Sequence, residues 1–166
     1  VEPVSLPCSH AYCRKCVTEL RDKKVAQACP LCREELPPGL DGLFDLGYRM
    51  YMRINGMVVR GEVTWASLPP ATQHEQDEAV AMMTEAADQG HLMAQVNLAD
   101  IYASPHGVEM NKPKAFELYS KAGTARLVDG VEHPGRPGSQ CNVAIMLRNG
   151  DGCDRDFEQS FHWFCK

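Results

Sequence analysis

Five cysteines and a histidine within the first 32 residues have the spacing of metal ligands. Cys-x-His and Cys-x-x-Cys pairs follow one another: Cys8 with His10, Cys13 with Cys16, and Cys29 with Cys32. Two residues between cysteines let a tight turn direct both sulfur atoms at one ion. Thiolate and imidazole donors in a tetrahedral set suit zinc best. The pattern predicts a zinc site, with free thiols, disulfides or another metal as the alternatives.

The spacing of these residues fits other cysteine-containing sites less well than it fits a zinc site. An iron–sulfur cluster would require ferredoxin-type spacing without the histidine, and a redox Cys-x-x-Cys requires a thioredoxin-like βαβ pattern that is not visible. A nucleophilic pair of Cys8 or Cys13 with His10 is the catalytic alternative. However, every cysteine in this stretch has a partner at ligand spacing. A structural metal is therefore the favoured interpretation.

Residues 1 to 36 contain too little apolar surface to fold alone. Ordering a small domain costs about 1.5 kcal/mol per residue, and a structural zinc site contributes about 10–16 kcal/mol. We expect this segment to be largely unfolded without metal. The large apolar side chains available to its core are Leu6, Tyr12, Val17, Leu20, Val25, Leu31 and Leu36.

The stretch PCSHAYCRKC…ACPLCREEL resembles the last six ligands of a RING-type zinc finger. RING fingers bind two zinc ions in a cross-brace, in which alternate ligand pairs share one ion. The resemblance implies one complete site from Cys8, His10, Cys29 and Cys32. Cys13 and Cys16 would form half of the other site, and the missing pair would lie upstream. We expect the chain to be a fragment that begins inside the finger; a degenerate one-zinc finger is the alternative.

The same resemblance implies a function as a ubiquitin ligase. RING fingers bind a ubiquitin-conjugating enzyme charged with ubiquitin and position its thioester, without a nucleophile of their own. Pro30 and Leu31 would contact the conjugating enzyme, and Arg33 would bridge it to ubiquitin. The alternatives to these contacts are that Pro30 only forms a turn, that Leu31 belongs to the core of the finger, and that Arg33 is a solvated charge. A non-catalytic scaffold, in which the finger only mediates protein contacts, is the alternative for the whole chain.

Composition narrows the range of partners. The formal net charge of -5 argues against a nucleic-acid partner. The basic residues of segment 1–36 are interleaved with acidic ones, six against five, which is typical of a solvated helix face. No apolar run approaches the roughly 18 residues of a membrane helix, so we expect no membrane partner. Reduced thiols indicate the cytoplasm or nucleus.

Helical periodicity begins after Pro37, Pro38 and Gly39, which predict a linker. Apolar residues fall on one face of segments 91–104 and 111–122, with Asn111 as a candidate N-cap. A shift of 45 residues aligns Ala94-Gln-Val-Asn-Leu-Ala with Ser139-Gln-Cys-Asn-Val-Ala, and Asn111 with Asp156. A unit of two antiparallel helices therefore recurs.

These units resemble Sel1-like repeats, relatives of the tetratricopeptide repeat. The resemblance covers 94–123 and 139–166, with a partial earlier copy, an insertion around Trp65 in 56–74 and a long connector at 124–138. The resemblance implies an array of helix pairs that binds protein segments. Small residues let the helices approach one another: Ala79, Ala94, Ala115 and Ser139. We expect Cys141, Cys153 and Cys165 to be reduced structural thiols. We expect the aromatic residues of the second helices to be core: Phe116, Phe161, Trp163 and Phe164.

The predicted fold class is mainly α, a small zinc-stabilised RING-type finger plus an α-solenoid of antiparallel helix pairs. The predicted domains are a truncated finger at 1–38 and repeats at 39–166, the latter divided at about 43–90, 91–123 and 139–166. The repeats would bind a protein substrate or scaffold a complex. The predicted cofactor is zinc, and the predicted partners of the finger are a ubiquitin-conjugating enzyme and ubiquitin.

Overall fold

The chain divides into two compact units, Val1–Gly42 and Leu43–Lys166. The structure is a computed structural model that describes residues 3–5, 10–13, 16–17, 28–34, 36, 38–125 and 135–165. The predicted domain boundary after residue 38 lies four residues before the division between the units. Within the described residues, no helix combines the length and apolar character needed to cross a membrane.

The first unit contains a two-stranded antiparallel sheet and a small core. β1 (Pro3–Ser5) pairs with β2 (Ala11–Cys13), and Val4 lies opposite Tyr12. The buried cluster consists of Val17, Cys29 and Leu36, with Tyr12 packed against it. Leu31 is 70% exposed, so the alternative in which this leucine belongs to the core is wrong. Leu6, Leu20 and Val25 lie outside the described residues.

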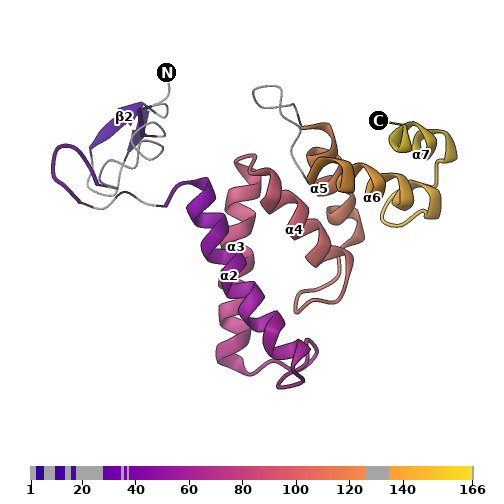
Figure 1. The fold of residues 1–166 in the computed structure, drawn as a ribbon, viewed down its shortest axis with the longest axis horizontal. Coiled ribbons are helices and arrows are strands. Elements are labelled where there is room, and N and C mark those ends of the chain that lie inside the picture. Colours follow the sequence, from indigo (N-terminus) through magenta and orange to yellow (C-terminus); the bar gives the residue numbers. More distant parts are fainter. Residues whose placement is uncertain are drawn as a thin grey trace. The chain divides into compact units, whose positions relative to one another are not determined.

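In the described part of the repeat region, six helices form three consecutive pairs (Figure 1). Each helix from α3 onward packs against the next, and α4 also contacts α6. This arrangement confirms the predicted array of helix pairs. The helices are α2 (Leu40–Val59), α3 (Pro70–Asp88), α4 (Leu92–Ala103), α5 (Lys112–Thr124), α6 (Gly135–Asn149) and α7 (Phe157–Phe164).

Small residues let the helices approach one another as predicted. Ala79, Ala94, Ala115 and Ser139 are all completely buried. Larger side chains fill the space between the helices, among them Met83, Leu98 and Val143. The apolar faces of α3 to α6 are therefore buried against neighbouring helices, as in a repeat array.

The predicted caps begin α5 and α7. Asn111 Oδ1 accepts a hydrogen bond from the backbone N–H of Lys114 at 3.0 Å, and Asp156 Oδ1 accepts one from Gln159 at 2.8 Å. Such bonds satisfy N–H groups that have no partner within the helix. α6 begins at Gly135, within the predicted connector 124–138, because Pro137 is compatible with a first helical turn.

The insertion between α2 and α3 packs through Trp65. Its ring stacks on Tyr51 with centroids 5.7 Å apart and meets the edge of His106 at 5.9 Å. Gly107 lies beneath the ring with φ +77°, and a Cβ atom there would lie 2.7 Å from the indole. The inserted tryptophan thus connects α2 to the α4–α5 loop, where the close contact requires glycine.

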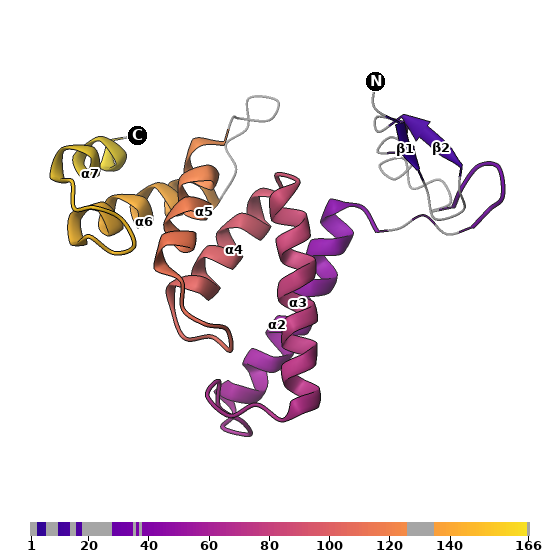
Figure 2. The same cartoon turned by 180° about the vertical axis from the view of Figure 1, so that it is seen from behind.

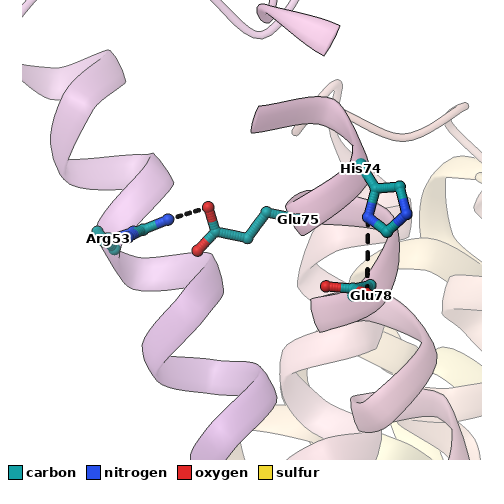
Figure 3. A network of polar contacts seen from close by, with 4 residues as sticks. All are labelled: Arg53, His74, Glu75 and Glu78. Atoms are coloured by element: carbon teal, nitrogen blue, oxygen red, sulfur yellow. Dashed lines mark hydrogen bonds and ion pairs between the residues drawn. The ribbon is translucent and has the colours of Figure 1, made fainter. Parts of the chain in front are cut away.

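α2 and α3 lie side by side when seen from opposite directions (Figures 1 and 2). The backbones approach closely at Gly47, where a Cβ atom would lie 2.8 Å from the Ala79 carbonyl oxygen. Arg53 of α2 extends toward α3 and pairs with Glu75, and His74 lies 3.6 Å from Glu78 one turn further along α3 (Figure 3). This first pair is therefore joined by packing and by an ion pair on its exposed side.

The predicted burial of the aromatic residues holds for α5 and only partly for α7. Phe116 and Trp163 pack against the main core, whereas Phe161 is 72% exposed and Phe164 is 49% exposed. The prediction is therefore wrong for Phe161 and Phe164. The physical reason is that α7 packs on α6 and, through Trp163, on Gly123 of α5, whereas the described helices leave its other face, which carries Phe161 and Phe164, exposed.

Candidate metal centre

Three of the predicted ligands converge in the first unit. The donor atoms of His10, Cys29 and Cys32 all lie within 4.8 Å of one another. His10 immediately precedes β2, whereas the two cysteines lie at the ends of one short turn. His10 and Cys29, which are 19 positions apart in sequence, therefore lie close together. A cross-brace requires this arrangement, because its alternate ligand pairs share one ion.

The distances fit a tetrahedral zinc site. His10 Nδ1 lies 3.6 Å from Cys29 Sγ. With Zn–S of about 2.3 Å and Zn–N of about 2.0 Å, two ligands of a tetrahedral ion are about 3.6 Å apart. Cys29 is 1% exposed, whereas His10 is half-buried and Cys32 is exposed. The donor set and its spacing are compatible with a zinc-binding finger, and Nδ1 is the imidazole nitrogen that lies 3.6 Å from Cys29 Sγ.

The surroundings of Cys29 favour its thiolate. Burial raises the pKa of the thiol, but this effect is outweighed by hydrogen bonds from the backbone of Cys32 and Leu31, and from the side chains of Tyr12 and Cys32. The net result is a pKa lowered from 9.0 to about 6. Because a metal binds the thiolate, this environment prepares Cys29 as a ligand near neutral pH.

The turn from Cys29 to Glu34 is fixed at both ends by backbone hydrogen bonds. The N–H of Cys29 donates to the Glu34 carbonyl at 2.7 Å, and the N–H of Arg33 donates to the Cys29 carbonyl at 2.8 Å. Arg33 has φ +63°, a left-handed conformation that is uncommon for residues other than glycine. Pro30, Leu31 and Arg33 are all exposed on this turn. The turn therefore holds both sulfur atoms close to His10 and leaves the side chains of Pro30, Leu31 and Arg33 exposed to solvent.

The remaining predicted ligands are not brought into this group by the described structure. Cys8 lies outside the described residues, and Cys13 is described only as a backbone position of β2. Cys16 is exposed and does not belong to the group formed by His10, Cys29 and Cys32. The assignment of Cys8 to this site, and of Cys13 and Cys16 to another, stays a prediction.

Sequence reasoning missed the contact between Tyr12 and the metal site. The Tyr12 hydroxyl lies 3.5 Å from Cys29 Sγ, although the sequence predicted only a core role for this residue. Alternate residues of a strand lie on the same face. Because Tyr12 follows His10 by two positions at the start of β2, strand alternation was the signal that could have identified it.

Comparisons with known proteins agree with the two units. Residues 1–32 match the family model "zinc finger, C3HC4 type (RING finger)", and residues 72–91, 92–125 and 137–166 match the Sel1 repeat. The chain is 49% identical over 35 residues to E3 ubiquitin-protein ligase rnf213-beta of Danio rerio, which covers 21% of this chain and 1% of that protein. It is 42% identical over 40 residues to E3 ubiquitin-protein ligase TRIM65 of Homo sapiens, 24% of this chain and 8% of that protein. The chain thus spans only a small part of these relatives.

Solved structures resemble the fold. The first is c5321, a protective antigen of uropathogenic Escherichia coli with an SLR fold, at a TM-score of 0.52 and 23% identity. The second is a Sel1 repeat protein of Oxalobacter formigenes, at a TM-score of 0.52 and 19% identity. Each likeness covers 90% of this chain, and 24% and 32% of the respective structures. These proteins share the helical repeat architecture.

Proposed function

Because this chain belongs to the Sel1 repeat proteins and carries a RING finger match at its N-terminus, we propose that it is part of a ubiquitin ligase. The finger positions a ubiquitin-charged conjugating enzyme, and the repeats bind the substrate or scaffold a complex. Catalysis by such a protein consists of orientation and preorganised hydrogen bonding, since no group of the finger forms a covalent bond to ubiquitin.

The zinc ligands of the proposed complete site are Cys8, His10, Cys29 and Cys32. Zinc supplies folding free energy there and takes no part in the transfer. Cys13 and Cys16 belong to the second site of the cross-brace. In this proposal the ligands act on the reaction only by holding the Cys29–Cys32 turn in place.

The observation that carries the proposal is the exposure of Leu31. A leucine that is 70% exposed on a turn fixed by two ligands is a rigid apolar contact, and Pro30 limits the freedom of the turn further. Arg33 follows directly and offers planar, forked donors that suit carbonyl acceptors on two proteins at once. We assign Pro30 and Leu31 to the conjugating enzyme and Arg33 to the contact that joins it to ubiquitin.

The test is auto-ubiquitination with a panel of conjugating enzymes, in a form of the chain that carries the ligands of both proposed zinc sites. Arg33→Gly is the sharpest variant, because glycine adopts φ +63° more readily than arginine and so removes the guanidinium without straining the turn. We expect Arg33→Gly and Leu31→Ala to reduce transfer at least about tenfold at unchanged zinc content. Arg148→Ala, which removes an exposed arginine of α6, should leave transfer unchanged.

The alternative predicts a different result. If no enzyme of the panel supports transfer while the chain still binds zinc, the finger is a non-catalytic contact module within a scaffold. If Arg33→Gly and the unchanged chain transfer ubiquitin equally well, Arg33 does not form the proposed contact between the conjugating enzyme and ubiquitin.

A further inference from the structure

A pocket of about 200 Å³ opens in the repeat array where α4, α5 and α6 meet. Ala103, Ile145 and Met146 form its apolar lining. Its polar lining consists of Lys112, Tyr119, Asn142 and Asp151. Small-molecule and cofactor sites usually measure about 300–1,000 Å³. This pocket is therefore better matched to one amino-acid side chain than to a cofactor.

Polar groups from three helices meet at the pocket. The Tyr119 hydroxyl of α5 donates to the carboxylate of Asp100 on α4, and Asn142 of α6 lines the pocket together with Tyr119. Tyr119 is 4% exposed, so its ring is fixed by packing, whereas Asn142 is half-buried. A side-chain amide offers both donor and acceptor groups, which matches the needs of a peptide backbone. The polar groups are thus held in place before any partner arrives.

The charge left uncompensated beside the pocket is negative. Lys112 Nζ lies 2.6 Å from Asp151 Oδ1, so these two charges offset each other. Asp100 is exposed and forms no ion pair with any residue that the structure describes. Residues 43–166 as a whole carry a net charge of -5, from 11 basic and 16 acidic residues. A cationic partner is therefore favoured over an acidic one.

Two tyrosines lie near this carboxylate. The Tyr119 hydroxyl donates to Asp100, and Tyr51 of α2, whose ring stacks on Trp65, lies within electrostatic range of Asp100. A carboxylate beside aromatic rings suits a lysine or arginine side chain, whose charge meets the anion while its stem lies against the ring.

We propose that this pocket binds an extended, basic segment of a partner protein. One apolar side chain of the segment enters the pocket between Ile145 and Met146, its backbone bonds to Asn142, and a neighbouring lysine or arginine reaches Asp100. The inference rests on the proposed role of the repeats as the partner-binding part of the chain. It concerns binding alone and involves no transfer of ubiquitin.

The probe is a fluorescently labelled synthetic peptide that repeats Lys-Leu-Gly, and the readout is anisotropy with the zinc-loaded chain. One control peptide repeats Glu-Leu-Gly and another repeats Lys-Ser-Gly. We expect saturable binding of the Lys-Leu-Gly peptide only. Asp100→Asn should weaken it about fivefold, since an exposed ion pair contributes up to about that factor. Glu85→Gln, which removes one exposed carboxylate from α3, should change it by less than about twofold.

Ile145→Ser tests the apolar part of the pocket against Val59→Ser, a change at an exposed valine of α2. We expect only Ile145→Ser to weaken binding, with the melting temperatures of both variants unchanged. Equal binding of the acidic peptide, or equal losses in Asp100→Asn and Glu85→Gln, would overturn the inference. If the chain transfers ubiquitin but does not bind the Lys-Leu-Gly peptide, only the proposed binding pocket is refuted. If it binds this peptide but does not transfer ubiquitin, only the proposed ligase function is refuted.

Discussion

Gln95 and Gln140 make the same contact in successive repeats. Gln95 Nε2 donates to the carbonyl of Ala87 at the end of α3, at 3.1 Å, and Gln140 Nε2 donates to the carbonyl of Gly123 at the end of α5, at 3.0 Å. Both glutamines are more than nine-tenths buried. The last carbonyls of a helix lack partners within it. Each glutamine therefore joins the first helix of one repeat to the end of the preceding repeat.

Replacing Gln140 by leucine should destabilise the array. The substitution keeps the side chain's approximate size but removes a buried hydrogen bond to Gly123, so we expect a loss of about 1 kcal/mol in the free energy of unfolding. Gln89→Leu, at an exposed position after α3, is the matched control and should change stability by less than about 0.5 kcal/mol. Urea denaturation followed by circular dichroism measures both. Equal values for the two variants would show that the buried amide contributes nothing.

The repeat architecture was predictable because its signals are local. The 45-residue shift aligned Gln95 with Gln140, and the caps at Asn111 and Asp156 follow from residue types at helix starts. The shift could not identify the carbonyl that each glutamine meets, because that depends on how successive helix pairs pack. Periodicity likewise identified the aromatic face of α7 without showing whether another helix covers it, which is why Phe161 was wrongly assigned to the core.

The exposure difference between Phe116 and Phe161 predicts different mutational costs at equivalent repeat positions. Phe116 packs against the main core, so Phe116→Ala should cost about 2 kcal/mol, below the 3–5 kcal/mol of a fully buried phenylalanine. Phe161 is 72% exposed, so Phe161→Ala should cost less than about 0.5 kcal/mol. Thermal denaturation of the two variants in parallel provides the comparison. Similar losses would mean that Phe161 is buried in solution, for example by association of chains.

Metal removal should unfold the finger while the repeats remain helical. The described core of the first unit is a few side chains around Cys29, whereas zinc contributes about 10–16 kcal/mol. Amide hydrogen exchange after dialysis against a chelator should show protection lost at residues 10–36 and retained in α3 to α6. Elemental analysis of residues 1–166 should find about one zinc ion, because these residues supply only Cys13 and Cys16 to the second site of the proposed cross-brace. Two tightly held ions would contradict this assignment.

A matched pair of cysteine variants separates the ligand from an ordinary thiol. Cys29→Ser removes a buried donor of the site, whereas Cys141→Ser changes an exposed free thiol of α6. We expect the first variant to lose zinc and the second to retain it at the level of the unchanged chain. Zinc retained in Cys29→Ser would exclude Cys29 as a ligand.

The metal site was predictable in composition but not in detail. The family resemblance predicted that His10, Cys29 and Cys32 converge, as their donor atoms do in the structure, because spacing alone does not reveal which pairs come together. The left-handed backbone at Arg33 and the hydroxyl of Tyr12 beside the sulfur depend on the folded turn and strand. No local pattern at Arg33 indicates a positive φ, since arginine rarely adopts one.

Two tyrosines should make the stability of the repeats depend on alkaline pH. Burial, then the charge of Asp100, then Tyr48 raise the pKa of Tyr51 from 10.0 to about 12. Burial and the hydrogen bond and charge of Asp100 raise the pKa of Tyr119 as well. Both groups therefore hold their protons more tightly in the folded chain than in the unfolded chain. By linkage, their contribution to stability is fully present below pH 10 and is lost as the pH rises toward the folded pKa values.

Asp100→Asn is the variant that tests this coupling, because it removes the charge near both hydroxyls and leaves an acceptor for Tyr119. We expect its stability to fall less steeply than that of the unchanged chain between about pH 10 and 12. Its phenol groups should also titrate at lower pH in ultraviolet absorbance. Tyr119→Phe should reduce the alkaline slope too, although it is less stable at neutral pH through loss of its hydrogen bond to Asp100. Stability curves that stay parallel across this pH range in all three proteins would show that Asp100 does not influence the two hydroxyls.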